Sequence, residues 1–360
     1  MSLINLKLYS YNETETPPDN LIPGRVTEQQ RTQYTVVTEY GEVTAVLKGS
    51  FVYDAVIRAD LPCVGDFVLL QYNENGDSII VKLLPRHSKF SRMDFSGHGY
   101  AHIKANMEQI VAVNFDYVFI LSSLNWDFKI NRIMRYITQT RQSGGQPVVI
   151  LTKADLVEDF NSQLSEVIQA APDVPVHAVS AHTGFGTEAL NEYLQPGKTV
   201  VFLGMSGVGK SSLLNALMNC EVMAVKAIRE DDSRGRHTTT HRQLFMLPSG
   251  AMVIDTPGMR ELGLFGAGDG ISMGFTDIEE LFTQCKFNDC RHQSEPGCAV
   301  KTAIADGILT RERWERYNQQ KSENKFTEDK KKRFSEEKAR GKSDAKFHKK
   351  YNKMRDLDKS

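Results

Sequence analysis

The stretch that decides the fold is Val200-Val201-Phe202-Leu203-Gly204-Met205-Ser206-Gly207-Val208-Gly209-Lys210-Ser211, in a chain of 360 residues. Its apolar start is typical of a buried strand, and residues 212–218 have the pattern of a helix. Between them stands G-x-x-x-x-G-K-[ST], in the strand–loop–helix context that a phosphate-binding loop requires. The stretch therefore predicts an α/β sheet with a phosphate site at the end of one strand.

The residue types of this loop explain how it would bind phosphate. Its glycines let backbone N–H groups turn inward around the phosphates, and the helix N-terminus adds its positive dipole end. The Lys210 ammonium reaches the β- and γ-phosphates, and the Ser211 hydroxyl is a ligand for Mg²⁺. The residues assigned to this part of the nucleotide site are Gly204, Met205, Ser206, Gly207, Val208, Gly209, Lys210, Ser211 and Ser212.

A second element follows an apolar run, where the chain continues as Asp255-Thr256-Pro257-Gly258. A strand that ends in D-x-x-G is the element with which a GTPase senses the γ-phosphate. We expect the Asp255 carboxylate to hold Mg²⁺ through water and the Gly258 N–H to bond the γ-phosphate. Together with Lys210, these residues predict a catalytic site that hydrolyses GTP.

Between the two elements lies a polar switch segment, Arg234-Gly235-Arg236-His237-Thr238-Thr239-Thr240. One threonine of such a loop completes the Mg²⁺ shell. Any of the three could serve, and Thr239 is preferred. Many GTPases carry a glutamine after D-x-x-G that orients the attacking water, but this chain has Met259 there, so slow intrinsic hydrolysis is expected. His237, a partner that orders the loop, or both would then orient the water.

No base-reading motif follows the D-x-x-G element, but one precedes the phosphate loop. One apolar run leads into Thr152-Lys153-Ala154-Asp155, and another leads into Ser180-Ala181. The Asp155 carboxylate can accept from guanine N1–H and N2–H₂, whereas adenine presents an acceptor at N1. The Lys153 stem can lie over the base, and the Ser180-Ala181 loop is like one that contacts guanine O6. Thr152 stands where asparagine is usual, and we expect it to be too short to bridge loops as an amide does.

The motifs therefore come in a circularly permuted order: base, base, phosphate, switch, sensor. A parallel sheet can be permuted if the original termini lie close together, as domain termini often do. Strands and helices alternate from about 109 to 265, which is typical of a parallel sheet covered by helices, and we assign residues 100–268 to this domain. The expected strands are 117–122, 147–152, 176–181, 199–204 and 251–255, and the expected helices include 131–141 and 211–218.

Residues 21–88 have a β-rich pattern instead. Short runs separated by turn signals suit a small barrel such as an OB-fold, and periodicity cannot separate this from an SH3-like barrel. The expected strands are 34–38, 43–47, 53–57, 67–72 and 79–84. The polar residues 1–20 predict a loose leader. The basic stretch 85–92 fits either a contact with nucleic acid or a solvated hinge, and the hinge is preferred.

A cluster of metal-ligand residues lies in the segment 275–320, which we expect to form a small helical domain. Its members are Cys285, Cys290, His292 and Cys298. Three thiolates and one imidazole suit a closed, tetrahedral, structural Zn²⁺ site, which has no open position for catalysis. An odd count of five cysteines without a signal peptide argues for metal and against a disulfide framework. The isolated Cys63 and Cys220 are expected to be small buried apolar residues.

The net charge of −1 hides an uneven distribution. Residues 321–360 hold 15 basic and 8 acidic residues, whereas the rest of the chain holds 29 and 37. A basic, partly disordered tail on an acidic body suits a polyanionic partner, or it is simply solvated. No apolar run approaches the about 20 residues of a membrane span, and the N-terminus lacks a signal peptide. A cytoplasmic protein without a membrane partner is expected and, because no coiled-coil heptads are seen, a monomer.

These features together resemble the RsgA (YjeQ) family of GTPases that depend on the small ribosomal subunit. The resemblance covers about residues 22–320 and rests on Gly24-Arg25-Val26, on the permuted motif order, and on the metal-ligand cluster followed by Ala299-Val300. It implies an N-terminal OB-fold, a permuted GTPase domain and a C-terminal zinc domain. It also implies binding to the small subunit and its 16S rRNA, stimulation of hydrolysis there, and a role in late subunit maturation. Similar proteins use the switch histidine and a hydrophobic residue in place of glutamine, as His237 and Met259 would.

Two other functions fit part of the pattern. A GTPase that regulates a protein partner or a membrane process would not respond to ribosomal subunits. A nucleic-acid-binding module in which nucleotide only switches affinity would still bind RNA after Lys210→Ala abolished GTP binding.

Overall fold

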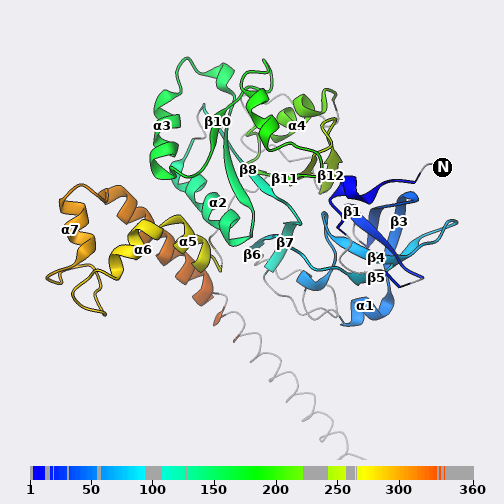
Figure 1. Cartoon of the computed structure of the whole chain (residues 1–360), viewed down its shortest axis with the longest axis horizontal. Coiled ribbons are helices and arrows are strands. Elements are labelled where there is room, and N and C mark those ends of the chain that lie inside the picture. Colours follow the sequence, from blue (N-terminus) through cyan, green and yellow to red (C-terminus); the bar gives the residue numbers. More distant parts are fainter. Residues whose placement is uncertain are drawn as a thin grey trace, which may run out of the picture.

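The computed structural model of the chain (Figure 1) runs from an N-terminal barrel through a central α/β domain to a group of C-terminal helices. It describes residues 3–12, 17–18, 20–30, 32–54, 58–93, 108–125, 128–221, 242–256, 264, 266–330, 332–333 and 336.

Five strands build the N-terminal barrel. They are β1 (Ile22–Gln30), β2 (Gln33–Thr38), β3 (Gly41–Leu47), β4 (Phe67–Gln71) and β5 (Ser78–Leu83). β1 pairs with both β2 and β4, and β3 pairs in parallel with β5, so the sheet closes on itself. Helix α1 (Gly49–Asp54) lies between β3 and β4 in the chain, followed by the short helix η2 (Arg58–Asp60). This closed five-strand order is that of an OB-fold and decides against the SH3-like alternative.

Two elements of the barrel differ from expectation. The strand expected at 53–57 is wrong, because the chain is helical in α1 up to Asp54, and residues 55–57 lie outside the described part. β1 was not among the runs named as strands, although residues 21–88 were expected to be β-rich. Its alternation is broken by a bulge between Val26 and Glu28 and by the buried charged residue Arg25, so its sequence lacks the period of a half-buried strand.

The leader is packed where the structure describes it. Its short helix η1 (Leu6–Tyr9) is followed by Tyr11, which is buried and tilted against the ring of Phe67 in the barrel. The Ser10 hydroxyl donates a hydrogen bond to the Gly197 carbonyl of the central domain. The leader therefore touches both the barrel and the domain that follows it.

A two-stranded ribbon connects the barrel to the central domain. It consists of β6 (Lys89–Met93) and β7 (Glu108–Val113), which pair in antiparallel fashion. The basic stretch at 85–92, which was expected to be a hinge, therefore runs into a strand. The intervening residues 94–107 lie outside the described part.

The central sheet contains the five expected strands, of which the one at 176–181 ends early at Ala178, and one strand that was not expected, β12. It contains β8 (Tyr117–Ser123), β9 (Gln146–Thr152), β10 (Val176–Ala178), β11 (Thr199–Gly204), β12 (Gln243–Met246) and β13 (Met252–Asp255). All are parallel to their neighbours except β12, which is antiparallel to β13. The order β10-β9-β8-β11-β13-β12 continues through β1 into the barrel, so one 11-stranded sheet joins both domains.

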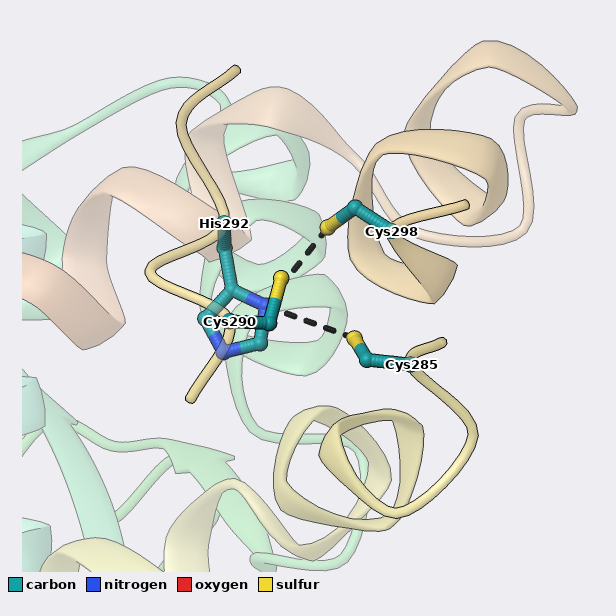
Figure 2. Close-up of side chains that lie close together, drawn as sticks. All are labelled: Cys285, Cys290, His292 and Cys298. Atoms are coloured by element: carbon teal, nitrogen blue, oxygen red, sulfur yellow. Dashed lines mark hydrogen bonds between the residues drawn. The ribbon is translucent and has the colours of Figure 1, made fainter. Parts of the chain in front are cut away.

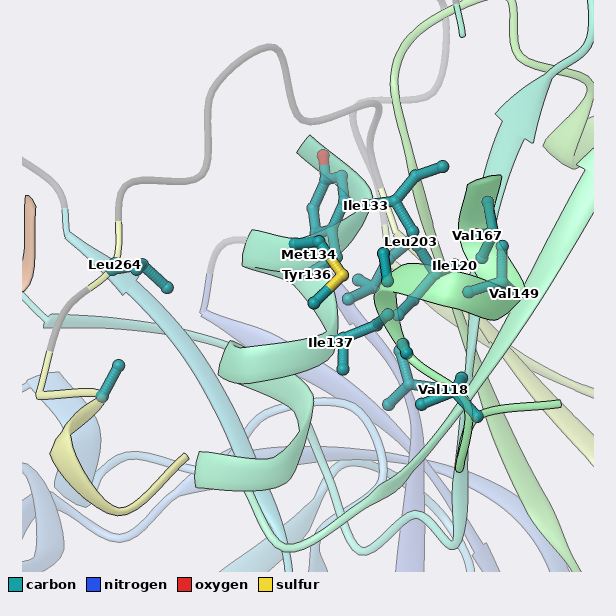
Figure 3. Close-up of a cluster of buried hydrophobic side chains, with 14 of the residues drawn as sticks. Val118, Ile120, Ile133, Met134, Tyr136, Ile137, Val149, Val167, Leu203 and Leu264 are labelled. Carbon is teal, nitrogen blue, oxygen red and sulfur yellow. The ribbon is translucent and has the colours of Figure 1, made fainter. Parts of the chain in front are cut away.

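Helices cover both faces of this sheet, which is why its strands read as continuous apolar runs. They are α2 (Ile130–Gln142), α3 (Asn161–Ala170), α4 (Lys210–Met218), and the short helices η3 (Ala154–Leu156) and η4 (Thr187–Glu192). Figure 3 shows the cluster in which Ile133 and Ile137 of α2 pack with Ile120 and Leu203 of the sheet. A second buried cluster lies on the opposite face of the sheet. In it Leu213 of α4 packs with strand residues such as Phe119 and Phe202, which alternate with those of the first cluster.

Three short helices and one longer helix form the C-terminal part. These are α5 (Gly268–Gly274), α6 (Thr276–Phe282), α7 (Ala299–Ala305) and the helical residues 311–330. The last helix packs on α2, because Thr138 donates to Gln320 at 2.6 Å between side-chain oxygens and Arg135 pairs with Glu323 at 2.9 Å. The boundary expected at residue 320 thus falls inside this helix, and residues 321–330 belong to the packed structure. No described helix is both long and apolar enough to cross a membrane.

Helices α5 and α2 pack so closely that one glycine has no room for a side chain, and this can be tested by substitution. A Cβ atom at Gly270 would lie 2.3 Å from the Thr138 carbonyl oxygen, whereas nothing lies within 4 Å of a Cβ at Gly268 of the same helix. We expect Gly270→Ala to lower the free energy of unfolding by about 1–3 kcal/mol, since the helices must separate. The matched variant Gly268→Ala should leave stability unchanged or slightly higher. Equal thermal melting curves for the two variants would contradict the close packing.

Candidate functional site

The sheet brings the separate motifs to one edge. β9, β10, β11 and β13 are parallel, so the residues that follow them gather at the carboxyl ends of the strands. The base-reading residues follow β9 and β10, the phosphate loop follows β11, and Asp255 ends β13. The strand order therefore puts base, phosphate and sensor elements in one row, although the chain visits them in permuted order.

The phosphate loop has the backbone conformation that its sequence predicts. Gly207 and Gly209 adopt φ values of 75° and 104°, a region that only glycine enters without strain. Gly209 caps the N-terminus of α4, so the helix begins at Lys210. The N–H groups of the first helical turn have no intrahelical acceptor and face the loop, as an anion site requires.

Lys210 is held inside this loop. Its ammonium donates to the Gly204 and Met205 carbonyl oxygens at 3.0 and 2.9 Å. Burial lowers the pKa of Lys210 to about 8, and the charge of Asp255 partly offsets this. This ammonium donates to two carbonyls of the loop and so lies where the loop would hold phosphate oxygens.

Asp255 is the most unusual group at this edge. It is 3% exposed, and its Oδ1 atom has no hydrogen-bond partner among the described residues. Burial raises the pKa of Asp255 to about 6, while Lys210 and the Thr256 N–H act in the opposite direction. Thr256 fixes the strand end beside the loop, because its hydroxyl donates to the Phe202 carbonyl at 2.6 Å. A buried carboxylate oxygen without a partner is a ready acceptor for metal-bound water.

Thr152 does more than its length suggested. Its hydroxyl donates to the Val208 carbonyl of the phosphate loop at 2.6 Å, and the residue is buried. The expectation that Thr152 could not bridge loops is therefore wrong. A short side chain is enough to make this bridge, because the phosphate loop passes close by: a Cβ atom at Gly209 would lie 3.8 Å from the Thr152 hydroxyl oxygen.

The two base-reading loops are tied to each other. The Ala154 N–H donates to the Val179 carbonyl at 3.1 Å, which joins the end of β9 to that of β10. Lys153 adopts a left-handed conformation with φ of 62°, so the chain turns sharply before Asp155, which is exposed to solvent. Ser180 is fully buried and accepts the Thr183 N–H at 3.2 Å. Asp155 is thus presented on a rigid turn, open to a ligand.

Four of the expected site residues lie outside the described part of the chain: His237, Thr239, Gly258 and Met259. One residue beside the loop was missed from sequence. The Arg132 guanidinium, in the first turn of α2, donates to the Met205 sulfur at 2.6 Å. A cation in the first turn of a helix opposes the helix dipole, and this is the signal that could have identified it.

The three cysteines and the histidine converge on one point in the C-terminal part (Figure 2). The candidate ligand atoms of Cys285, Cys290, His292 and Cys298 all lie within 4.8 Å of one another. His292 Nδ1 lies 3.6 Å from the Cys285 sulfur and 3.5 Å from the Cys298 sulfur. Ligands at zinc distances in a tetrahedron would be separated by about 3.6 Å. The four residues therefore fit one tetrahedral metal ion.

Neighbouring groups hold these ligands in place. The Phe282 ring stacks on His292 with centroids 4.3 Å apart, and Trp314 meets it edge-on at 5.7 Å. Burial lowers the pKa of His292, so the neutral imidazole that binds metal is favoured. The Glu295 carboxylate accepts three backbone N–H groups and closes the loop. Of the two isolated cysteines, Cys63 is buried as expected, whereas Cys220, just after α4, is exposed.

The comparisons with known proteins agree with this geometry. The family model of the RsgA GTPase matches residues 83–265. The Small ribosomal subunit biogenesis GTPase RsgA 2 of Lactiplantibacillus plantarum is 45% identical over 302 residues, covering 84% of this chain and 83% of that protein. The Small ribosomal subunit biogenesis GTPase RsgA of Methanosarcina acetivorans is 40% identical over 307 residues, covering 85% and 80%.

Two solved structures are similar throughout most of their length. YjeQ from Thermotoga maritima has a TM-score of 0.61 and 28% sequence identity, and the match covers 83% of this chain and 96% of that one. YloQ, a circularly permuted GTPase, has a TM-score of 0.57 and 23% identity, covering 87% and 96%. The second likeness concerns the fold alone, and it confirms the permuted arrangement of the central domain.

The Thr152 hydrogen bond can be tested by a single change. We expect Thr152→Val to weaken GDP binding by about threefold to tenfold, which corresponds to about 0.5–1.5 kcal/mol for one hydrogen bond. The matched control is Thr140→Val, because Thr140 is also buried but its hydroxyl has no partner among the described residues. Calorimetric titration with GDP should show wild-type affinity for the control. A wild-type affinity for Thr152→Val would contradict the bridge.

The buried charges predict a bell-shaped dependence of magnesium–nucleotide binding on pH. Below a pH of about 6 the Asp255 carboxylate is protonated and cannot hold a metal. Above about 8 Lys210 loses its proton in the free protein, so binding must first restore it. Affinity should therefore fall on both sides, and Asp255→Asn should remove only the acid limb. A wild-type affinity that stays constant from about pH 5 to about pH 9 would contradict these shifts.

Proposed function

The chain belongs to the RsgA GTPase family, and from this premise we propose that it binds the small ribosomal subunit and assists its late maturation. It is a GTP-hydrolysing enzyme, and its intrinsic rate is low until the subunit raises it. The observation that carries the proposal is the row of base, phosphate and sensor elements along one sheet edge. The names of the curated relatives supply the partner.

The residues at this edge take distinct roles in binding GTP. Lys210 transfers its ammonium contacts from the loop carbonyls to the β- and γ-phosphates. Ser211 and Asp255, whose Oδ1 has no hydrogen-bond partner among the described residues, would hold Mg²⁺. When bound, Mg²⁺ neutralises charge on the β- and γ-phosphate oxygens. The N–H groups of the loop and of the first turn of α4 bind the remaining oxygens.

Guanine is read at the other end of the row. The exposed Asp155 carboxylate accepts from N1–H and N2–H₂, and an adenine base in the same place would meet it with an acceptor. The Lys153 stem covers the base plane, and the backbone at Ser180 and Ala181 faces O6. The hydrogen bond from Thr152 to Val208 keeps this base site at a fixed distance from the phosphate loop.

Hydrolysis then requires one water to attack the γ-phosphorus as the bond to the β-phosphate oxygen breaks, giving GDP and phosphate. His237 orients this water in our proposal, Thr239 completes the magnesium shell, and Gly258 contacts the γ-phosphate. Met259 supplies no polar group, so a partner must order the switch segment for efficient turnover.

Charge supports a ribosomal partner. Lys325 and Lys330 are exposed on the last described helix, and Phe326, which follows Lys325 directly, is 69% exposed. The basic tail continues this surface in sequence. Cations around an exposed aromatic ring suit RNA, in which phosphates and bases lie side by side. We assign 16S rRNA as the contact, and we expect the protein to act as a cytoplasmic monomer.

The metal in the C-terminal part is Zn²⁺ in this proposal. Three thiolates and one imidazole leave no open coordination position, so the ion would hold α6 and α7 together and would not take part in hydrolysis. Its role would be to shape the surface that the subunit meets.

The function is tested by GTP turnover of the full chain with and without purified small ribosomal subunits. Large subunits are the matched control, because they offer a similar polyanionic RNA surface. We expect small subunits to raise turnover by about tenfold or more, since a partner completes the site. Stimulation below a few-fold, or equal stimulation by large subunits, would overturn the proposed partner.

The zinc site gives a separate prediction. Intact protein should contain one equivalent of zinc, and Cys290→Ser should lose it and destabilise the C-terminal helices by several kcal/mol, about what loss of a structural metal costs a small domain. Cys220→Ser, which removes an exposed cysteine far from the cluster in sequence, should keep the metal. Less than one equivalent of zinc in the wild-type protein would contradict the assignment.

A further inference from the structure

A single arginine of the barrel is inserted into the central domain. Arg25 in β1 is completely buried, and its Nη2 atom donates to the Asn114 carbonyl at 2.8 Å and to the Thr199 hydroxyl at 3.1 Å. Its Nη1 atom donates to the Tyr9 carbonyl of the leader at 2.8 Å, and its Nε atom to the Gly65 carbonyl at 3.3 Å. One guanidinium therefore joins the leader, the barrel and the central sheet.

Burying a guanidinium costs free energy, so Arg25 must be held by contacts that match its donors. Burial lowers the pKa of Arg25 to about 10, although Asp116 and Asp66 oppose this. The guanidinium also lies 4.9 Å from the centre of the Phe67 ring. A buried charge is stable only where its donors are matched, and only the planar guanidinium fork can reach acceptors on so many sides.

The same strand leads to the edge of the sheet at which Lys210 and Asp255 lie, called the catalytic edge below. Further along β1, Glu28 pairs with Gln243, the first residue of β12. On its other side Gln243 pairs with Asp255 at the end of β13. Glu28, Gln243 and Asp255 thus occupy one row across three adjacent strands. β12 is also the element that follows the switch segment, since it begins soon after residue 240.

We propose that the barrel, an OB-fold of the kind that binds nucleic acid, is a further contact for the small subunit and that β1 relays this contact to the catalytic edge, with Arg25 as the positioning residue that makes the relay rigid. Arg25 fixes β1 against the starts of β11 and β13, because it reaches Thr199 and the Met252 sulfur, the latter at 3.1 Å. A displacement of the barrel then reaches Gln243 and Asp255 through the strand register. This inference rests on the proposed function, because it explains how the subunit stimulates hydrolysis.

The connecting ribbon is the competing route. β7 is the covalent link between the domains, and the Arg242 guanidinium donates to its Ile110 carbonyl at 2.8 Å. Arg25 also bonds the carbonyl of Asn114, the residue after β7, but its contacts with Thr199 and Met252 bypass the ribbon. The two routes are therefore separated by Thr199→Val, which removes a contact of the β1 route alone.

The test is Arg25→Lys in the full chain, which keeps the charge but cannot span the acceptors. We expect the turnover stimulated by small subunits to fall by about tenfold, within the usual range for coupling between two sites. Intrinsic turnover and affinity for the subunit should both remain within about twofold of wild type, since Arg25 lies outside the nucleotide site. The diagnostic quantity is the ratio of stimulated to intrinsic turnover.

Arg86→Lys is the matched control. Arg86 is also a largely buried arginine with several bonds, but its partners are Asp66, Ala59 and Leu61, all within residues 21–88. It should lower the melting temperature and leave the stimulation ratio unchanged. If Arg25→Lys does not fold, Thr199→Val removes one cross-domain acceptor and should reduce the ratio by about threefold, as expected for loss of one hydrogen bond.

The outcomes separate the relay from the proposed function. If small subunits fail to stimulate the wild-type protein, the proposed function is wrong and the relay falls with it. If they stimulate wild type and Arg25→Lys equally, the relay is wrong while the function stands. An equal loss of ratio in Arg86→Lys would also overturn the relay, because general loosening of the barrel would then be sufficient.

Discussion

The register between β11 and β13 is the constraint on which the site depends. Phe202 pairs with Asp255, so the sensor carboxylate lies beside the strand that opens into the phosphate loop. Lys210 and Asp255 are therefore buried close to each other. Burial lowers the pKa of Lys210 and raises the pKa of Asp255, and both shifts favour the neutral form of the group. Among the described residues, Asp255 Oδ1 has no hydrogen-bond partner and the Lys210 ammonium donates to two loop carbonyls, so the pair suits a ligand that supplies phosphate oxygens and a divalent cation.

The permuted order leaves this corner intact and changes what is attached to it. In the sheet the base, phosphate and sensor elements stand in one row, and hydrogen bonds such as that from Thr152 to Val208 join them regardless of chain order. The edge strand β12, however, now meets the barrel strand β1. The barrel is therefore a continuation of the GTPase sheet on the side of β12.

Much of this could be predicted from the sequence, because the strongest patterns are local. The buried strands of the central sheet are continuous apolar runs, and the phosphate loop and cysteine cluster have ligand spacings that few other structures share. Contacts between distant segments could not be predicted. Arg25 lies in a strand without clear alternation, and nothing local reveals that its acceptors are Tyr9, Asn114 and Thr199. Likewise, the helix that continues past residue 320 is stabilised by α2, far away in the chain.

The central claim, that Asp155 reads guanine although its motif precedes the phosphate loop, is tested most directly by changing the base and the residue together. Asp155→Asn replaces one acceptor with an N–H donor, which suits the C2 carbonyl of xanthine and repels the amino group of guanine. We predict that the wild-type protein prefers GDP to XDP, and that the variant prefers XDP by about a hundredfold, as expected when a polar site is mismatched with its ligand. A variant that still prefers GDP would show that Asp155 does not contact the base.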